Sequence, residues 1–430
     1  MMTLQQRVHS AKRPEGWTLD KLHRTLNVRR GNKNSGMVDN NLLSLSYGRI
    51  IPKDINADGG LLPESFETYQ VIEAGDIVMR LTDLQNDKRS LRQGLATERG
   101  IITSAYDALH VARDNDPKFW FYSLLALDLA KYYYSIGGGV RQSVKFSDFP
   151  NEWIYRPDLP TQKRIAAFLD CETSRIDELI LKKERLVSLL QERGDAAREE
   201  LLWGQGPSTK LGHHISILPG YAFASTNFSE NPNDIRLLRG ANVGANEVRW
   251  DDVVYWPKAD IAGLQRFELN AGDIVMGMDR PWISGGIRVA EITEDDLPCL
   301  LLQRVCKIAP RSTLSVRFLK AIIESRKFIA YFEPILTGVS VPHISSDQIA
   351  NFRFPFIDKD EQERRMTKLE RITRSIFPIT QATQTSIDRL REYRSALIAA
   401  AVTGQIDVDT YGKADATATI LDQIEDEMHA

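Results

Sequence analysis

The feature that most constrains this chain is an internal duplication with a period near 200 residues. The segment Glu73–Met79, which reads Glu-Ala-Gly-Asp-Ile-Val-Met, recurs at Asn270–Met276 with six consecutive identities and an offset of 197. Weaker matches follow in the same order, and the offset reaches 200 at Gln162 and Gln362. A unit of this length is too long for a solenoid repeat, which spans about 20 to 45 residues. The sequence therefore predicts two diverged copies of one arrangement.

The first part of each copy has the pattern of a mixed helix and strand domain. Short β-branched or aromatic runs alternate with Gly, Pro, Asn and Asp, which is typical of strands joined by turns. Two such runs flank an Ala-Gly-Asp turn in Tyr69–Met79 and again in Phe267–Met276, so we expect a hairpin at each place. Helical spacing of apolar residues in 118–135 and 315–332 predicts one helix in each copy, packed on the sheet.

The second part of each copy is expected to be one long helix. Apolar residues recur there in alternating steps of four and three, which is the heptad spacing of a coiled coil. Gly204 and Gly404 fit C-terminal caps, and Pro378 is expected to kink the second helix or to remove a turn. The expected seam consists of Ile165, Leu169, Ile176, Leu179, Leu186 and Leu190 in the first helix and Leu369, Ile372, Ile376, Ile379, Leu390 and Leu397 in the second.

Two helices of this kind would each be about 60 Å long, at a rise of about 1.5 Å per residue. Each has an incomplete apolar stripe, so the simplest arrangement pairs them as an antiparallel coiled coil with a globular domain at each end. The alternative is that each helix packs on its own globular domain. The expected fold class is α+β, with globular domains at 1–157 and 206–355, long helices at 158–205 and 356–405, and a flexible acidic tail at 406–430.

Composition and charge place the chain among ordinary globular proteins. Hydrophobic residues make up 42% and charged residues 26%, and the three cysteines lack the C-x-x-C spacing of zinc or redox motifs. The first residues lack the apolar core of a signal peptide, and no stretch approaches 18 uninterrupted apolar residues, so we expect a cytoplasmic protein without a membrane segment. The tail Ile406–Ala430 carries one Lys and seven acids, so the net charge of −3 conceals a balance of +3 elsewhere and does not exclude DNA binding.

No catalytic or metal motif of adequate specificity is present. The sequence lacks a P-loop and a G-x-G-x-x-G turn opening a βαβ unit, and it also lacks the Asn-Pro-Pro-Tyr type of tetrapeptide found in amino-methyltransferases. His213 and His214 have no carboxylate or Cys neighbours at ligand spacing. Cys171 lies on the first long helix, where a structural role is expected. We therefore expect no catalytic residue, no metal and no cofactor in this chain.

The duplicated layout resembles the specificity subunits of type I restriction-modification systems over nearly the whole chain. The residues that carry the resemblance are Glu15-Gly-Trp17, the repeated Glu-Ala-Gly-Asp-Ile-Val-Met motif, and a Leu-Pro or Phe-Pro step into a Gln-x-Arg helix. These helices close with Leu-Trp-Gly-Gln205 and Val-Thr-Gly-Gln405. The first copy has Thr161-Gln162 where the family usually has Glu-Gln, and the second copy keeps Glu-Gln.

The resemblance implies two target-recognition domains, each reading one half of an asymmetric bipartite DNA target, with the coiled coil fixing the spacer. It implies no catalytic activity in this chain. Two modification subunits would methylate adenine with S-adenosylmethionine, and restriction subunits would use ATP and Mg to translocate and cut double-stranded DNA. Two rival functions remain. A protein-binding scaffold predicts no salt-dependent DNA affinity, and an enzyme with an unrecognised site predicts turnover by the chain alone.

Candidate DNA-contacting residues lie near the repeated motif and the glycine run, because base edges are read by Arg, Lys, Asn and Gln. The alternative for any single one is a solvated surface charge, but a basic loop at the same place in both copies favours DNA contact. The candidates are Arg80, Arg89, Arg92, Gln93, Arg141, Gln142 and Lys145 in the first domain and Arg239, Asn242, Arg280, Trp282, Arg288, Ser340 and His343 in the second.

Overall fold

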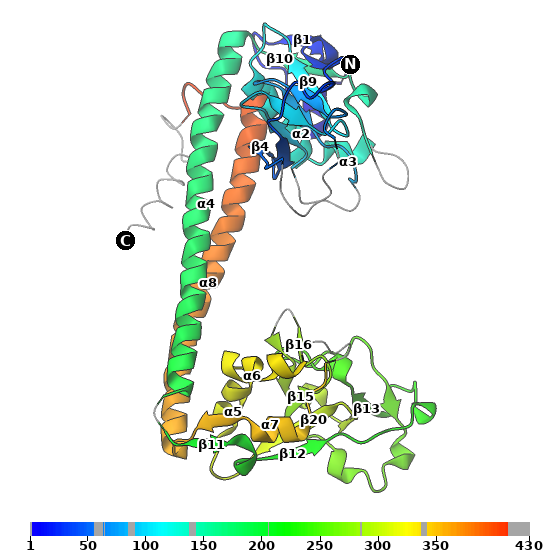
Figure 1. The fold of residues 1–430 in the computed structure, drawn as a ribbon, viewed down its shortest axis with the longest axis vertical. Coiled ribbons are helices and arrows are strands. Elements are labelled where there is room, and N and C mark those ends of the chain that lie inside the picture. The colour runs from blue at the N-terminus through cyan, green and yellow to red at the C-terminus, as the bar shows by residue number, and fades with distance from the viewer. Residues whose placement is uncertain are drawn as a thin grey trace. The chain divides into compact units, whose positions relative to one another are not determined.

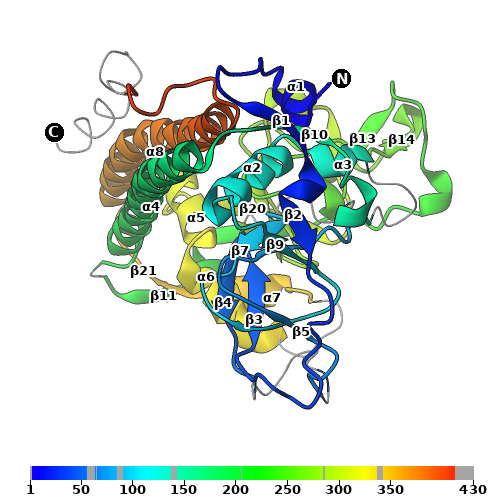
Figure 2. The same ribbon diagram turned by 90° about the horizontal axis from the view of Figure 1, so that it is seen from above.

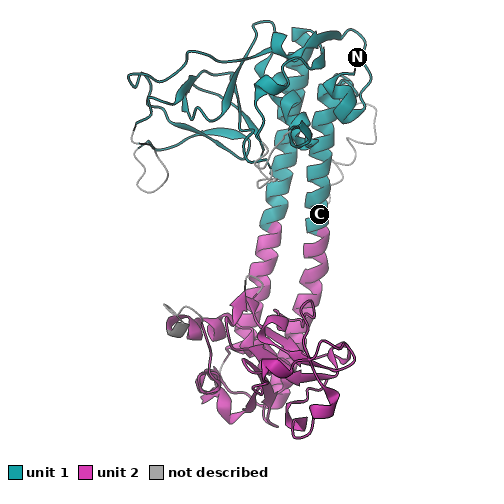
Figure 3. Cartoon of the chain, turned by 90° about the vertical axis from the view of Figure 1, so that its right-hand side faces the viewer, with its two compact units in different colours: residues 1–185, 383–430 teal, residues 186–382 magenta. Residues whose placement is uncertain are grey.

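The computed structural model describes residues 2–55, 63, 65–84, 91–136, 143–204, 206–283, 286–336 and 342–411. The chain forms two compact units (Figure 3): unit 1 comprises residues 1–185 and 383–430, and unit 2 comprises residues 186–382. Both boundaries fall inside a long helix, either α4 (Leu159–Leu202) or α8 (Lys359–Val402). Each unit therefore contains one globular part, the start of one long helix and the end of the other.

The globular part of unit 1 is built on a four-stranded antiparallel sheet in the order β2-β9-β6-β7. Helix α2 packs against strand β7 at one edge of this sheet (Figure 2). The elements are α1 (Leu4–His9), β1 (Thr18–Lys21), β2 (Leu26–Val28), β3 (Leu43–Ser46), β4 (Arg49–Pro52), β5 (Gln70–Ile72), β6 (Ile77–Met79), β7 (Gln93–Leu95), β8 (Gly100–Ile102), β9 (Asp107–Val111), α2 (Pro117–Leu129), α3 (Tyr132–Ile136) and β10 (Trp153–Arg156).

The globular part of unit 2 repeats this arrangement with the sheet order β12-β20-β15-β18, of which β12, β15 and β20 are labelled in Figure 1. A three-stranded sheet, β14-β13-β19, forms a second layer. The elements are β11 (Ser208–Lys210), β12 (Ile215–Pro219), β13 (Ile235–Leu238), β14 (Tyr255–Trp256), β15 (Ile274–Gly277), β16 (Trp282–Ile283), β17 (Gly286–Ile287), β18 (Val289–Glu291), β19 (Cys299–Leu301), β20 (Val305–Pro310), α5 (Val316–Ile323), α6 (Arg326–Leu336), α7 (Ser346–Asn351) and β21 (Arg353–Pro355).

The repeated motif forms a central strand in each copy. Its three apolar residues are at most 1% exposed in both β6 and β15, which explains why they are identical. The expected hairpin is wrong in both places, because β5 pairs with β8 whereas β6 pairs with β7 and β9. The turn carries the chain from one sheet to the next: Gly75 and Gly272 have φ of 90° and 86°, and the Asp76 carboxylate accepts a hydrogen bond from the Glu73 N–H at 2.8 Å.

The helix expected after the sheet is divided into two in each copy. In the first copy α2 ends before Lys131, which has a left-handed φ of 60°, and α3 follows. In the second copy Ser325 lies between α5 and α6, and its buried hydroxyl accepts a hydrogen bond from the Phe328 N–H at 3.2 Å. This contact starts α6 in the manner of an N-cap, so one expected helix becomes two.

The long helices α4 and α8 pack together and run antiparallel, as the sequence predicts. Within unit 1, Arg394 pairs with Asp177 at 2.8 Å and Arg391 pairs with Glu184 at 2.8 Å, so residue numbers rise along α4 while they fall along α8. Helix α8 continues through Pro378, so of the two expected effects of this proline, a kink or the loss of a turn, the loss of a turn does not occur.

The same direction holds within unit 2. Arg365 of α8 donates a hydrogen bond from Nη1 to the Leu201 carbonyl of α4 at 3.1 Å, and the Ile376 side chain lies beside Gly194. Met366 and Leu369 of α8 share the unit 2 core with Leu201 of α4. Each unit therefore holds its own antiparallel section of the helix pair.

Burial along the predicted seam is strongest where a globular part also covers the helices. Leu186 and Ile379, predicted to lie in the seam, are 42% and 48% exposed, so these two assignments are wrong. Thr173, Ile387 and Ile398 were not predicted and are buried. The predicted residues that are buried are Ile165, Leu169, Ile176, Leu179, Leu369, Leu390 and Leu397, and those of intermediate burial are Leu190, Ile372 and Ile376.

A buried glutamine fixes the start of α4 to the globular part of unit 1. The Gln162 side chain is 0% exposed, and its Oε1 accepts a hydrogen bond from the Asp116 N–H at the N-cap of α2 at 2.8 Å. Its Nε2 donates to the Pro157 carbonyl at 2.9 Å. The amide therefore joins α2, the segment after β10 and α4.

The second copy repeats this junction. Gln362 is 0% exposed, and its Oε1 accepts from the Ser315 N–H at the N-cap of α5 at 2.8 Å. Its Nε2 donates to the carbonyls of Thr313 at 3.0 Å and Ile357 at 2.8 Å. The Gln residue of the Gln-x-Arg helix entry is thus a structural anchor in both copies.

We predict that Gln362→Leu destabilises the full chain, because one buried and two partly buried backbone groups lose their partner while side-chain volume is nearly kept. The expected loss in the free energy of unfolding is about 1–3 kcal/mol. The matched control is Gln384→Leu on the exposed face of the same helix, where the side chain donates a hydrogen bond to the Asp388 carboxylate. Thermal and urea unfolding of both variants measure the difference, and equal shifts would contradict the anchoring role.

Candidate nucleic-acid interface

In unit 2 the loops beside the sheet form a hollow with four arginines in its lining. They follow β13 (Arg239), follow β15 (Arg280), precede β18 (Arg288) and connect β19 to β20 (Arg304). The remaining lining residues are Gly240, Ala241, Asp279, Leu302 and Gln303. The structure therefore brings together three candidates from the sequence, Arg239, Arg280 and Arg288, although they lie up to 49 positions apart. Such a concentration of guanidinium groups attracts anionic ligands.

Asp279 organises the rim of this hollow. Its Oδ2 accepts a hydrogen bond from Arg304 Nη1 at 2.9 Å, and its Oδ1 lies 2.6 Å from His343 Nδ1. The side chains of Arg304 and His343 are 68% and 51% exposed, whereas that of Asp279 is 20% exposed. The mostly buried carboxylate of Asp279 thus holds two exposed side chains, Arg304 and His343, which can form hydrogen bonds with nucleic acid.

Two arginines of the hollow have left-handed backbone conformations. Arg280 has φ of 44° and Arg304 has φ of 70°, a region that costs a residue with a Cβ about 1–2 kcal/mol. Each is held by backbone hydrogen bonds: the Arg280 N–H donates to the Pro342 carbonyl at 2.8 Å, and the Arg304 carbonyl accepts from the Met278 N–H at 2.9 Å. Strain of this kind concentrates at functional sites.

Arg288, predicted from the sequence to contact DNA, is half-buried in the lining of the hollow and makes scaffold contacts there. Its Nε donates to the Val243 carbonyl at 2.9 Å, its Nη1 donates to the Asp279 carbonyl at 3.4 Å, and its Nη2 donates to the Gly240 carbonyl. Burial, together with the neighbouring Arg280, lowers the pKa of the Arg288 guanidinium from its ordinary value. The guanidinium ties the loop after β13 to the loop after β15 and uses three of its five N–H groups in these contacts.

Arg92 has the same role in unit 1, so the expectation that it contacts DNA is wrong. Its side chain is 0% exposed, with Nη1 donating to the Thr82 carbonyl at 3.2 Å and Nε donating to the Tyr134 hydroxyl at 3.3 Å. Arg92 precedes β7 as Arg288 precedes β18, and the two strands occupy the same edge position in their sheets. The guanidinium is covered because α3 and the loop after β6 close over it.

Gln93 and Asn242 are also buried, and the structure contradicts their assignment as base readers. Asn242 is 2% exposed, and its Nδ2 donates to the carbonyls of Arg249 and Asp252 at 2.9 and 3.0 Å, which fixes a loop. Gln93 is 0% exposed and lies on β7, beneath α2. Neither polar atom of the Gln93 side chain has a hydrogen-bond partner among the described residues.

The other candidates differ in accessibility. Lys145, Arg280 and His343 are exposed, and Arg80 is half-buried. Arg239 is half-buried, and its Nη2 donates to the Asp252 carbonyl at 2.7 Å. Trp282 is half-buried and packs against the unit 2 core, so it has a structural contact. Arg89, Arg141, Gln142 and Ser340 lie outside the described residues.

Sequence reasoning missed Asp279, Gln303 and Arg304. Gln303-Arg304 directly follows a buried apolar run, Cys299–Leu302, which is a strand signal with a polar turn after it. That signal could have identified the turn. It could not have shown that the turn lies beside Arg280, because this proximity depends on the pairing of β15 with β20.

The other chemical features of the described residues are those of a packed protein interior. In the described ranges no group of three or more His, Cys, Asp or Glu is arranged to hold a metal. His214 is fixed by Thr313, whose hydroxyl lies 2.9 Å from Nδ1, and stacks on Phe356. Burial raises the pKa of the Cys299 and Cys306 thiols to about 12. None of the helices that can be described is both long and apolar enough to cross a membrane.

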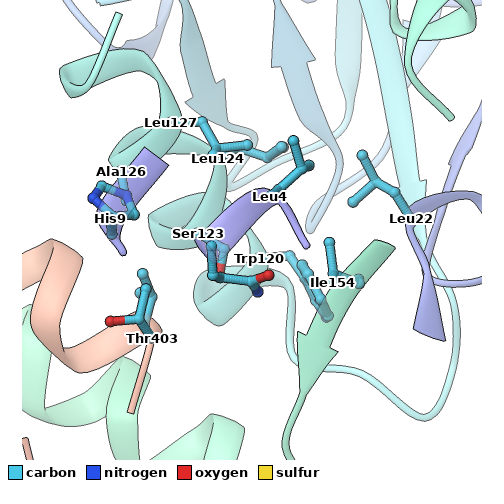
Figure 4. A pocket seen from close by; sticks show the side chains of 12 residues that line it. Leu4, His9, Leu22, Trp120, Ser123, Leu124, Ala126, Leu127, Ile154 and Thr403 are labelled. Carbon is cyan, nitrogen blue, oxygen red and sulfur yellow. The ribbon is translucent and has the colours of Figure 1, made fainter. Parts of the chain in front are cut away.

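A small cavity in unit 1 lies where α1, α2 and the end of α8 meet (Figure 4). Its volume is about 20 Å³, which holds roughly one water molecule. The lining is mostly apolar and includes Leu4, Trp120 and Leu124, with His9 at one side. Burial lowers the pKa of His9 from its ordinary value. The cavity is a packing void and is too small for a cofactor.

Comparisons with known proteins point to one family. Over 194 residues, or 45% of this chain, the sequence is 35% identical to the type I restriction enzyme EcoAI specificity subunit of Escherichia coli, and this match spans 32% of that relative. Over 423 residues it is 24% identical to the type I restriction enzyme MjaVIII specificity subunit of Methanocaldococcus jannaschii, covering 93% of this chain and 95% of that relative. No family model matches the sequence.

Two solved structures share the fold. One, described as the structural basis of complex assembly and conformational transition of the type I R-M system, has a TM-score of 0.71 at 17% identity and covers 92% of this chain and all of that one. The other is the HsdS subunit from Thermoanaerobacter tengcongensis, with a TM-score of 0.55 at 18% identity, covering 93% of this chain and 99% of that one.

We predict that Gln93→Leu stabilises the chain, because it removes a buried amide that lacks hydrogen-bond partners among the described residues. The expected gain in the free energy of unfolding is about 1 kcal/mol. Gln93→Glu has the same shape but buries a carboxylate, so it is expected to lower stability at neutral pH. Urea unfolding of the two variants measures both effects. A loss of stability in Gln93→Leu would show that the amide has a partner.

Proposed function

We propose that this chain, which is similar in sequence to specificity subunits of type I restriction enzymes, is the DNA sequence-specificity subunit of a type I restriction-modification complex. The observation that carries this proposal is the relationship to the MjaVIII subunit, which extends over 93% of this chain and 95% of that relative. The duplicated fold adds support, because two copies of one globular part suit a target with two half-sites.

In this proposal each globular part is a target-recognition domain. Residues 1–157 read one half-site and residues 206–355 read the other, while the helices 158–205 and 356–405 fix the spacer and residues 406–430 form an acidic tail. The basic residues that we assign to DNA contact, all exposed or half-buried, are Arg80 and Lys145 in the first domain and Arg239, Arg280, Arg304 and His343 in the second. They supply the hydrogen-bond donors that read base edges or contact phosphates.

The proposal assigns catalysis to partner chains. Two modification subunits would bring S-adenosylmethionine and methylate adenine, and restriction subunits would use ATP and Mg to translocate and cut double-stranded DNA in the cytoplasm. The solved relative described in terms of type I complex assembly supports such an association. This chain would contribute sequence recognition and geometry without a catalytic residue of its own.

We predict that deleting this gene from its source genome abolishes adenine methylation at one asymmetric bipartite motif. Modified-base sequencing of the two strains gives the motif, both half-sites and the spacer. Restoring the gene in trans is the control and should restore the same motif. An unchanged methylation map, with the partner genes expressed, would contradict the proposal.

We further predict that lengthening both long helices shifts the spacer. Seven extra residues in each, inserted near 186 in α4 and near 382 in α8, preserve the heptad and add about 10 Å, which corresponds to about three base pairs. Methylation mapping should then show unchanged half-sites with a spacer about three base pairs longer. A seven-residue insertion in α4 alone is the control and should disrupt pairing. An altered half-site would argue against a spacer role.

A further inference from the structure

The internal duplication separates arginines that build the fold from arginines that do not. Arg92 and Arg288 occupy the same place in the two copies, and in each the guanidinium Nη1 donates to the carbonyl three residues after the end of the repeated motif, Thr82 or Asp279. These two carbonyl residues are 197 positions apart, the same offset as the repeated motif. An arginine that both copies use in the same contact belongs to the scaffold.

The first copy has no arginine at the positions that correspond to Arg280 and Arg304. With the motif offset of 197, Arg280 corresponds to Asp83, and the two residues share a left-handed φ of 44° and 57°. With the offset of 199 that aligns β8 with β19 and β9 with β20, Arg304 corresponds to Ala105. The fold therefore does not need an arginine at either position.

Both side chains are available to a ligand and one of them is held in place. Arg304 is 68% exposed, and Asp279 holds its guanidinium through the 2.9 Å hydrogen bond to Oδ2. Arg280 is exposed and lines the same hollow. A guanidinium fixed by a carboxylate loses less conformational entropy on binding than a free one, which favours selective contacts.

The presence of Asp279 favours a base edge over a phosphate as the ligand. Asp279 is paired with Arg304 and offsets part of the positive charge at this rim, which weakens the attraction for a phosphate there but not the hydrogen bonds to a neutral base edge. The O6 and N7 atoms of guanine are neutral acceptors, and they match the two parallel donors of a guanidinium. The exposed His343, on the other oxygen of Asp279, adds a further hydrogen-bonding group beside the same rim.

We propose that Arg280 and Arg304 are specificity-determining residues of the second globular part, each reading a guanine in the half-site of unit 2, with Asp279 positioning Arg304. This inference rests on the proposed function. It goes beyond that function by naming the base and the residues that recognise it.

The test uses the purified complex of the full chain with its modification subunits, and duplexes in which each base pair of the half-site is replaced in turn. Arg304→Gln should lose discrimination at one G·C pair by roughly 5- to 150-fold and move its preference towards A·T, because the glutamine amide matches adenine. Arg280→Gln should do the same at a different pair of the same half-site. The other half-site should keep its discrimination in both variants.

Three controls make the outcome decisive. Arg326→Gln removes an exposed arginine of α6 that pairs with Asp195, and it should leave discrimination unchanged. Asp279→Ala should lower discrimination at the same pair as Arg304→Gln, and the double variant should be no worse than Arg304→Gln alone. Thermal unfolding identifies a variant that fails to fold, in which case the other arginine variant decides.

Two results would overturn the inference. One is uniform weakening over all sequences with a salt slope smaller by about one, which indicates a phosphate contact. The other is unchanged discrimination in folded variants. If the wild-type complex binds no bipartite duplex more tightly than other sequences, the proposed function itself is wrong. If the wild-type complex and the arginine variants discriminate between sequences equally well, only the assignment of these arginines is contradicted.

Discussion

The buried amide at the start of each long helix is the contact on which the arrangement of each unit depends. A glutamine side chain can accept and donate at once, so Gln162 and Gln362 each join a helix N-cap, the segment after a strand and the first turn of the long helix. An apolar residue would bury these positions but leave the backbone groups unpaired. The direction in which α4 leaves unit 1 and α8 leaves unit 2 is therefore fixed by hydrogen bonds as well as by apolar packing.

The parts of the fold that follow from local periodicity could be predicted from the sequence. The heptad spacing gave both long helices and their pairing, because the seam residues recur within each helix regardless of what covers them. The hairpins predicted at the two Ala-Gly-Asp turns were wrong, because a turn motif shows that the chain reverses but does not show which strands pair. The predicted burial of Leu186 and Ile379 in the seam was wrong for a related reason, because a heptad position is buried only where a partner helix or a globular part covers it.

The site was harder to predict because a buried arginine and an exposed one look alike in a sequence. Arg92 and Arg280 both follow the repeated motif of their copy, yet Arg92 is fully covered and Arg280 is exposed. The difference arises from contacts distant in sequence, such as the Tyr134 hydroxyl that accepts from Arg92. Arg304 was not predicted, because its position beside Arg280 depends on the pairing of β15 with β20, and no local sequence pattern shows this pairing.

A shared scaffold arginine has a physical consequence for how recognition can change. Arg288 joins two loops by donating to the Gly240 and Val243 carbonyls after β13 and to the Asp279 carbonyl after β15, so these loops are held without the side chains of Arg280 or Arg304. The left-handed conformation at Arg280 also occurs at Asp83 in the first copy, which shows that the backbone there is set by the scaffold and accepts different side chains. Side chains on such a frame can be exchanged at little cost in stability, because no buried backbone group depends on them. The duplication therefore separates the residues that maintain the fold from those free to select a ligand.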